Sequence, residues 1–285
     1  MIAVRFKVGI VDVSTLGKID IQGPDSAEFL NRLYINGFKK LEVGKARYGV
    51  MLREDGMAMD DGTTARLGEH HFVMTTTTAN AGPVFRHMEF CRQCLWPELD
   101  VNLISTTDGW AQFAVAGPNA RKLLQKVVDP EHDITNEAFP FMACAELTIC
   151  GGTKARLFRI SFSGELAFEI AVPARYGDSL MRVLMAVGEE FDVVPYGTEA
   201  LGVMRIEKGH AAGNELTGQT SAANLGMGRM VSKKKDCIGN TLSERPDLNR
   251  DDGLRLVGFK PVNRVETLTS GAHFIALGKS AVMDN

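Results

Sequence analysis

The chain has 285 residues, of which 45% are hydrophobic and 24% charged, and its formal net charge is −3. This composition is typical of a soluble globular protein with more than one core, and the near-neutral charge favours neither a nucleic acid nor an anionic membrane as a partner. No apolar run approaches the roughly 20 residues that a membrane helix needs, and the N-terminus lacks a signal-peptide core. Five scattered cysteines, an odd number, are most simply the reduced thiols of a cytoplasmic protein.

The chain repeats one pattern of strand, Gly-Pro turn and helix. The pattern occurs around Gly23 and again around Gly117, 94 positions later, and a further strand and helix follow in each copy. The repeat units extend over residues 17–95 and 111–190. The apolar stripes expected on the helices are Phe29, Leu30 and Leu33, then Val84, Phe85 and Met88 in the first unit, and Leu123, Leu124 and Val127, then Leu180, Met181 and Leu184 in the second. We therefore predict an α+β fold of two α/β units related by a pseudo-twofold axis, with any ligand between them.

The first unit contains two adjacent acids, Asp60 and Asp61, on a strand that follows a turn at Gly56. An Asp-Gly pair between apolar runs is a strong turn signal. Successive strand side chains point to opposite faces, so one carboxylate can lie in a pocket while its neighbour lies in water. A charged turn at a sheet edge is the alternative interpretation.

Cys91 and Cys94 need a separate interpretation because His87 precedes them on the same expected helix. Three soft ligands could then share one helix face. A structural zinc site, however, takes four ligands, usually from two separated pairs, and no second pair is present. A redox pair would open a helix, whereas this one follows a helix. We therefore expect no metal site here.

The stretch from residue 195 to residue 235 combines a helix with a polar, Gly-rich segment. The helix is predicted to begin at Thr198 and to end at Gly209. The run 213–230 lacks the strand and the third glycine of a dinucleotide-binding fingerprint. The three lysines from Lys233 to Lys235 predict a solvated patch, with phosphate contact as the alternative. The apolar positions expected on the helix are Leu201, Met204 and Ile206.

The C-terminal part of the chain reads as a separate, incomplete β domain over residues 247–285. It opens with a polar linker, and strands are predicted at 254–259 and 272–277. Because two strands cannot form a stable layer alone, this part is expected to be a truncated β-barrel-like domain.

Together these features resemble the folate-dependent aminomethyltransferase family, which includes the glycine cleavage T-protein. The likeness covers most of the chain. It is carried by the segment from Asp12 to Ser14, the turns at Gly23 and Gly117, the acids Asp60 and Asp61, the strand from Gly164 to Ile170 with Glu169, and the helix from Met204 to Gly209 with Arg205. Within the family, the runs 48–56, 91–100 and 205–216 are most similar to the C-terminal half of the alpha subunit of heterotetrameric sarcosine oxidase.

The resemblance implies that residues 1–246 bind tetrahydrofolate. The pterin ring of folate carries a 2-amino-pyrimidinone edge, to which a carboxylate can make two parallel hydrogen bonds. Glu169 is the expected acceptor, since its neighbours Phe168 and Ile170 face the other side of the strand. Asp61 is implied as the catalytic acid, and its neighbour Asp60 as a residue of the cofactor site. Arg205 would pair with a carboxylate or contact the ligand.

The implied function is one-carbon transfer in a sarcosine oxidase alpha subunit. The domain would capture the imine carbon of oxidised sarcosine, an N-methyl amine, as 5,10-methylenetetrahydrofolate and release glycine. Flavin and NAD would lie on absent domains or on the other sarcosine oxidase subunits. The alternatives are a stand-alone aminomethyltransferase and a catalytically silent folate-binding scaffold. The iron–sulfur maturation branch of the fold is disfavoured because His210 stands where that branch has a cysteine.

Overall fold

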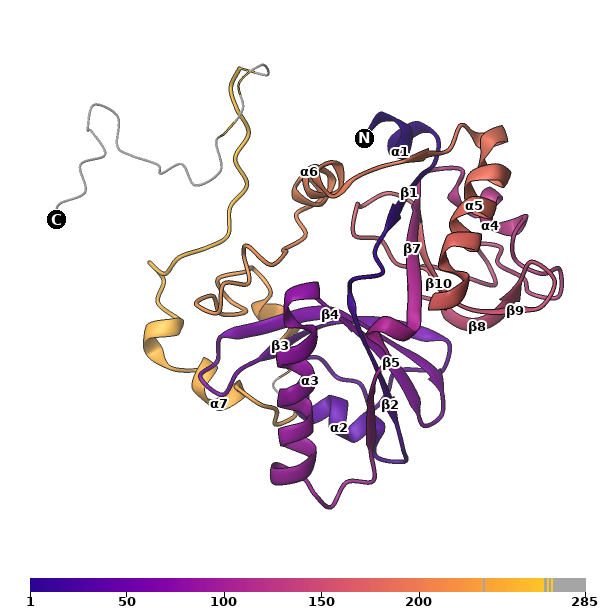
Figure 1. Ribbon diagram of the computed structural model, residues 1–285. Helices are drawn as coiled ribbons and strands as arrows, with labels where there is room; N and C mark the ends of the chain where they lie inside the picture. The colour runs from indigo at the N-terminus through magenta and orange to yellow at the C-terminus, as the bar shows by residue number, and fades with distance from the viewer. Residues whose placement is uncertain (233, 264–265, 267, 269–285) are drawn as a thin grey trace.

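Two β-sheets form the centre of the protein in the computed structural model, which describes residues 1–232, 234–263, 266 and 268 (Figure 1). The five-stranded sheet is antiparallel throughout, and in the six-stranded sheet only the β11–β1 pair is parallel. In spatial order the smaller sheet contains β3 (Lys45–Leu52), β4 (Ala58–Gly68), β5 (His71–Thr76), β2 (Gly17–Gln22) and β6 (Asn102–Ser105). The larger contains β11 (Val194–Pro195), β1 (Gly9–Asp12), β7 (Trp110–Ala116), β10 (Ala167–Pro173), β9 (Thr153–Phe158) and β8 (Cys144–Ile149).

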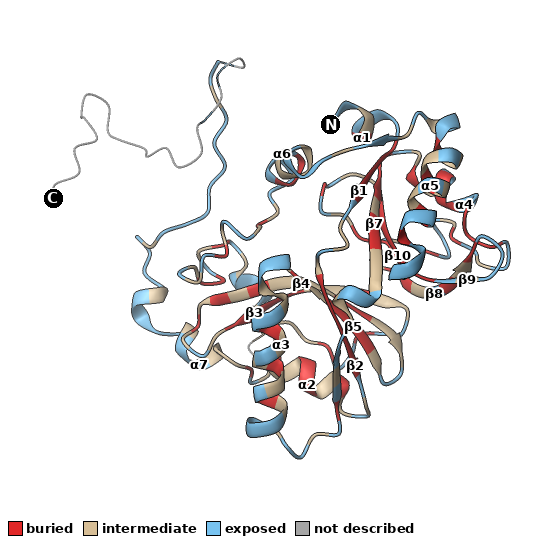
Figure 2. Ribbon diagram, in the orientation of Figure 1, coloured by how far each residue is buried: buried red, intermediate tan, exposed pale blue. Residues whose placement is uncertain are grey.

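Helices cover one face of each sheet, and Figure 2 shows the buried residues along the strands and on the helix sides that face them. The longer helices are α2 (Ser26–Leu33) and α3 (Ala81–Phe90) on the smaller sheet, and α4 (Ala120–Gln125) and α5 (Gly177–Gly188) on the larger. The other helices are α1 (Ile2–Phe6), α6 (Thr198–Lys208) and α7 (Asn240–Ser243). A π-helical turn, Cys91–Leu95, follows α3. Short 3₁₀ turns occupy Thr78–Asn80, Thr107–Gly109, Ala174–Tyr176, Glu189–Phe191, Gly228–Met230 and Pro246–Leu248.

The expected apolar stripes lie in two separate cores. Phe29, Leu30 and Leu33 of α2 are fully buried against β2 and β5, and Leu123 and Leu124 of α4 are fully buried in the other core. Burial of such side chains stabilises each by about 1.5–3 kcal/mol. The 3.6-residue spacing in the sequence therefore predicted these helix faces correctly.

The two sheets exchange a strand. β1 precedes β2 in the chain but pairs with β7, and β6 precedes β7 but pairs with β2. The Gly-Pro turns match this exchange: a Cβ on Gly23 (φ 132°) would meet the Asp100 carbonyl oxygen at 2.3 Å, and one on Gly117 (φ 130°) would meet the Lys7 carbonyl oxygen at 2.5 Å. Both glycines thus let the chain pass close to the residues that lead into the exchanged strands. The pseudo-twofold axis itself stays a prediction.

The sheets are also joined at their edges and across their facing surfaces. Ala46 N of β3 donates to the Met142 carbonyl at 2.7 Å, and Cys144 N donates to the Gly44 carbonyl at 2.9 Å. Arg156 of β9 makes two hydrogen bonds, of 2.9 and 2.8 Å, to the buried carboxylate of Asp20 on β2. These contacts hold the two sheets in one fixed arrangement.

Helix α6 begins and ends where the sequence predicts, with Gly209 in the left-handed conformation (φ 83°). Its predicted apolar stripe is partly wrong, because Met204 is 1% exposed and Ile206 is 59% exposed. Residues two apart on a helix point about 200° apart, so the two side chains cannot face one surface. Only the Met204 side packs against the rest of the protein, beside Val4 of α1.

The predicted strand at 254–259 is wrong. This segment has no strand partner within the described residues, and Leu254 and Val257 are 87% and 60% exposed. Its backbone is held instead by Asn224, which donates to the Leu254 carbonyl at 2.6 Å and accepts from Leu256 N at 2.7 Å. Residues 272–277 and Lys233 lie outside the described residues, and the described part of the chain forms no closed barrel.

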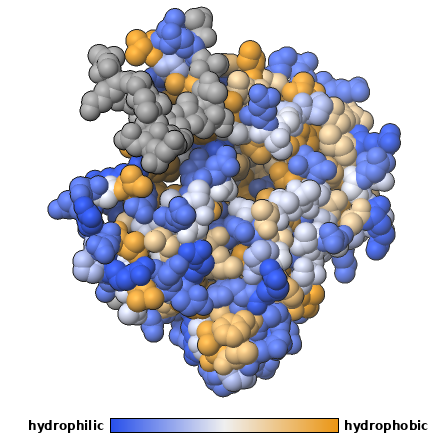
Figure 3. Space-filling view, turned by 60° about the vertical axis from the view of Figure 1, so that its left-hand side comes forward, coloured by the Kyte–Doolittle hydropathy of each residue, from blue (hydrophilic) through white to orange (hydrophobic). Residues whose placement is uncertain are grey.

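Hydrophilic and hydrophobic residues are interspersed on the molecular face drawn in Figure 3. Among the helices of the described ranges, none combines the length and the apolar character that crossing a membrane requires.

Candidate functional site

Glu169 lies on β10, in the interior of the six-stranded sheet. Its neighbours Phe168 and Ile170 are fully buried in the core under α4 and α5, so Glu169 faces the other side, as predicted from strand alternation. The register pairs Glu169 with Ala114. On this face Glu169 is flanked by Ala114 of β7 and Phe158 of β9, and Val11 of β1 lies beyond Ala114. The positions two residues along β10, Ala167 and Ala171, are small.

The Glu169 carboxylate is 8% exposed, and its Oε2 accepts a hydrogen bond from the Gln112 side-chain amide. No protein group in the described residues donates to Oε1. Burial raises the pKa of Glu169 to about 7, although the Gln112 hydrogen bond and the charge of Lys18 act in the opposite direction. Glu169 therefore titrates near neutral pH and has one oxygen free to accept.

Lys18 is the positively charged side chain that interacts electrostatically with Glu169. It is 2% exposed, and its Nζ donates to the carbonyl oxygens of Ser14, Leu16 and Thr107 at 2.8, 3.0 and 3.3 Å. Burial lowers the pKa of Lys18, while the negative charge of Glu169 is the largest influence that raises it. Three carbonyls thus fix an ammonium group between the two sheets, close to Glu169.

Asp61 lies on β4 of the five-stranded sheet and accepts a 2.7 Å hydrogen bond from the Tyr48 hydroxyl. Burial raises the pKa of Asp61 to about 6; the Tyr48 hydrogen bond lowers it, and the charges of Asp60 and Glu215 raise it further. Burial and the Asp61 charge raise the pKa of Tyr48 as well, so the phenol stays protonated. Asp61 can therefore exchange a proton near neutral pH.

Asp61 and Glu169 lie on the surfaces that the two sheets turn toward each other. Asp61 shares a strand face with Thr63, whose hydroxyl lies 3.2 Å from that of Thr75. Thr75 is paired with Lys18, which interacts electrostatically with Glu169. A continuous row of polar side chains thus leads from one acid toward the other.

Asp60 does not share this row. It is 3% exposed and accepts hydrogen bonds from Thr77 N at 3.0 Å, from Thr77 Oγ1 at 2.7 Å and from Asn80 Nδ2 at 3.0 Å. These bonds hold the turn that leads into α3, and they occupy both carboxylate oxygens. A cofactor contact by Asp60 stays a prediction with no open acceptor to support it.

Arg205 is buried and pairs with a carboxylate. Its Nη1 donates to Glu215 Oε1 at 2.7 Å and to the His210 carbonyl at 3.2 Å, and Glu215 Oε2 accepts from Ala212 N at 2.8 Å. Arg205 therefore fixes the loop that brings Glu215 into electrostatic range of Asp61. A direct ligand contact by Arg205 stays a prediction.

Cys91 and Cys94 lie in different environments. Cys91 is fully buried with its Sγ 3.7 Å from His87 Nε2, and Cys94 is exposed. Burial raises the pKa of Cys91 to about 12, which keeps its thiol protonated. Within the described residues, no group of three or more His, Cys, Asp or Glu side chains is arranged to hold a metal ion.

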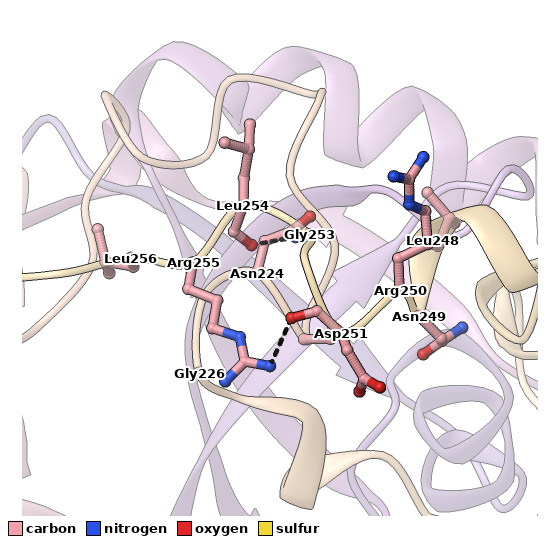
Figure 4. A pocket seen from close by; sticks show the side chains of 11 residues that line it. Asn224, Gly226, Leu248, Asn249, Arg250, Asp251, Gly253, Leu254, Arg255 and Leu256 are labelled. Atoms are coloured by element: carbon pink, nitrogen blue, oxygen red, sulfur yellow. Dashed lines mark hydrogen bonds between the residues drawn. The ribbon is translucent and has the colours of Figure 1, made fainter.

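A cavity of about 340 Å³ lies elsewhere, between the turn at Asn224 and residues 248–256 (Figure 4). Its two arginines have partners within the same segment: Arg250 makes two hydrogen bonds to Asp252, and Arg255 donates to the Asp251 carbonyl at 3.2 Å. The cavity lacks the buried acids that distinguish the facing surfaces of the sheets.

The two sheets and their helices form a mixed α/β fold of the aminomethyltransferase type. Residues 1–235 match the family model described as "GCVT N-terminal domain", and the chain belongs to this family. The family prediction made from the motifs is thereby confirmed.

Named relatives agree with this assignment. The chain is 54% identical over 284 residues to "Sarcosine oxidase subunit alpha" of Rhizobium meliloti (strain 1021). The matched region covers 99% of this chain and 29% of that subunit. It is 30% identical over 268 residues to "Aminomethyltransferase" of Listeria monocytogenes serotype 4a (strain HCC23), which covers 92% of this chain and 69% of that one. The chain thus spans less than a third of the length of the alpha subunit that it matches.

A solved structure supports the fold. The chain matches the glycine cleavage system aminomethyltransferase T from Bartonella henselae with a TM-score of 0.73 and 24% identity, over 85% of this chain and 63% of that one. At this identity the likeness establishes the mixed α/β fold alone.

Several side chains around the site, among them Lys18 and Gln112, were missed at the level of sequence. Tyr48 could have been found, because the hairpin register pairs Tyr48 with Thr63 and so places Tyr48 diagonally opposite Asp61. The Asp20–Arg156 ion pair joins residues 136 positions apart, and no local pattern signals it.

Proposed function

We propose that this chain binds tetrahydrofolate between its two sheets and acts as the one-carbon transfer domain of a sarcosine oxidase alpha subunit. The observation that carries the proposal is Glu169, a buried carboxylate with one free oxygen on the face that its sheet turns toward the other sheet. The 54% identity to a sarcosine oxidase alpha subunit supports the choice of enzyme.

The residues present fit a flat heterocycle with an amino-pyrimidinone edge. Such an edge offers adjacent N–H donors, which a carboxylate accepts through charge-assisted hydrogen bonds. Glu169 would hold it in the ionised form, and Lys18, fixed by three carbonyls, favours that form. The small side chain of Ala114, which is paired with Glu169 and only partly buried, suits a planar ring lying against the sheet.

Tetrahydrofolate supplies two nucleophilic nitrogens, N5 and N10, and carries the one-carbon unit away as 5,10-methylenetetrahydrofolate. Asp61 would accept or return a proton at the position where the nitrogens meet the imine of oxidised sarcosine, and glycine would leave. Its pKa of about 6 suits that exchange near neutral pH. Tyr48 holds the Asp61 carboxylate in place through its 2.7 Å hydrogen bond.

Oxidation of sarcosine would take place on flavin, with NAD and flavin bound by domains outside this chain or by the other sarcosine oxidase subunits. A second candidate is a stand-alone aminomethyltransferase, which the 30% identity to a Listeria monocytogenes aminomethyltransferase favours. In a catalytically silent scaffold, folate would bind but exchange of Asp61 would leave one-carbon transfer unchanged.

The test is tetrahydrofolate binding by calorimetry and by the shift in Tm. A ligand that binds only the native state raises Tm. We expect wild type to bind, Glu169→Gln to bind at least tenfold more weakly, and the exposed control Glu42→Gln to match wild type. Equal affinity for wild type and Glu169→Gln would refute Glu169 as the anchor, and no binding to wild type would refute the proposed function.

A further inference from the structure

Tyr196 places its ring on the same sheet face as Glu169. It directly follows β11, and its backbone N donates to the Ile10 carbonyl of β1 at 2.9 Å. A Cβ on Gly9 would lie 2.8 Å from Tyr196 Cδ1, so the ring rests in space that any other residue at position 9 would fill. Gly9 is paired with Ala116, on the face that carries Glu169.

The register connects the seat of the Tyr196 ring with the strand of Glu169. Ala116 is paired with Ala167, which precedes Glu169 by two residues on β10 and points to the same face. The two alanines between the ring and the acid are buried, so this part of the face is closed to water. The charge of Glu169 acts on Tyr196: together with burial, it raises the pKa of the phenol, which stays protonated and able to donate.

The hydroxyl group of Tyr196 is buried and has no hydrogen-bond partner within the described part of the chain. Its surroundings are apolar, with Val4, Ala116 and Met204 in the same cluster. Buried hydroxyls in folded proteins almost always have a partner, so an unpartnered one on the sheet face that carries Glu169 needs an explanation. A bound ligand supplies one.

We propose that the Tyr196 hydroxyl is a second polar contact for the ring that Glu169 holds. It would donate a hydrogen bond to the ring carbonyl, which is adjacent to the N–H groups whose hydrogen bonds Glu169 accepts. The inference rests on the proposed function and adds a recognition residue to it. A carboxylate can only accept, and a protonated phenol beside it can donate, so the pair matches an edge with adjacent N–H and C=O groups.

The variant Tyr196→Phe removes the hydroxyl and keeps the ring over Gly9. We expect it to weaken tetrahydrofolate binding about tenfold, the size of one buried hydrogen bond. The Tm of the ligand-free protein should stay the same or rise, because no protein hydrogen bond is lost. Tyr176→Phe is the matched control, since Tyr176 is 39% exposed on a 3₁₀ turn.

A truncated ligand locates the contact. The probe 6-methyltetrahydropterin keeps the heterocycle and lacks the aminobenzoyl-glutamate tail, so Tyr196→Phe should weaken its binding by the same factor. If the loss occurs with tetrahydrofolate alone, the hydroxyl contacts the tail and the inference is wrong. If Tyr196→Phe binds both ligands like wild type while Glu169→Gln does not, the proposed function survives and this inference fails.

Discussion

The ion pair between Asp20 and Arg156 should make a large, acid-sensitive contribution to stability. Both side chains are less than 10% exposed, and Asp20 also accepts from His71 Nε2 at 3.1 Å and from Thr106 Oγ1 at 3.1 Å. Burial opposes ionisation, but the hydrogen bonds from His71 and Arg156 outweigh it and lower the pKa of Asp20 to about 2. Asp20→Asn keeps the shape and removes the charge. It should cost about 3–5 kcal/mol at pH 7, because it leaves the Arg156 guanidinium buried without its main partner.

The dependence on pH gives a sharper test than the size of the loss. The pKa of Asp20 in the folded protein lies below its ordinary value of 3.8, so its contribution to stability is complete well above pH 4 and is lost as the pH falls toward 2. This lowering of the Asp20 pKa corresponds to about 2.5 kcal/mol in the free energy of unfolding, and about half of that contribution is lost by pH 3.

Urea denaturation of wild type and Asp20→Asn at several pH values between 7 and 3 measures this contribution. The other carboxyl groups titrate in both proteins, so they largely cancel in the difference between the two free energies of unfolding. That difference should shrink by more than 1 kcal/mol between pH 6 and pH 3. A difference that stays constant over this range would refute the assignment of a low pKa to Asp20 and, with it, the strength of this link between the sheets.

Three further predictions concern the site and the exchange of strands. Because the pKa of Glu169 is about 7, tetrahydrofolate affinity should fall as the pH drops from 8 to 6, and Glu169→Gln should bind weakly at every pH; a flat wild-type profile by calorimetry would contradict this. Asp61→Asn should leave folate affinity within about threefold of wild type and slow methylenetetrahydrofolate formation in the assembled enzyme at least tenfold; a normal rate would remove Asp61 from the chemistry. Gly117→Ala should lower the free energy of unfolding by at least about 2 kcal/mol in urea denaturation, since φ is 130° and the Lys7 carbonyl oxygen lies 2.5 Å from the new Cβ. The control Gly109→Ala, which has open space around it, should change the free energy of unfolding very little. Equal effects of the two substitutions would count against the close approach at Gly117.

Local patterns in the sequence predicted the parts of the fold that depend on local physics. The 3.6-residue spacing placed Phe29, Leu30 and Leu33 in a core, and strand alternation placed Glu169 opposite Phe168 and Ile170. The start of α6 at Thr198 and its end at Gly209 follow from backbone preferences that act within a few residues.

Features that depend on distant pairing could not be predicted in this way. Nothing near residue 9 indicates that β1 pairs with β7, so both the exchange of strands and the seat of Tyr196 over Gly9 were missed. The apolar run at 254–259 has the composition of a strand but no described partner, and composition alone does not supply one. The role of Asp60 depends on Thr77 and Asn80, which lie 17 and 20 positions away.

The exchange of β1 and β6 makes each half of the protein dependent on the other for a finished sheet. A gene fragment that encoded only residues 1–95 would carry β1 without β7 and would leave the backbone groups of β2 unpaired along one side. An uncovered strand of this kind recruits other chains and promotes aggregation. We therefore expect the two halves to unfold as one cooperative unit, and fragments divided between them to aggregate instead of forming two working modules.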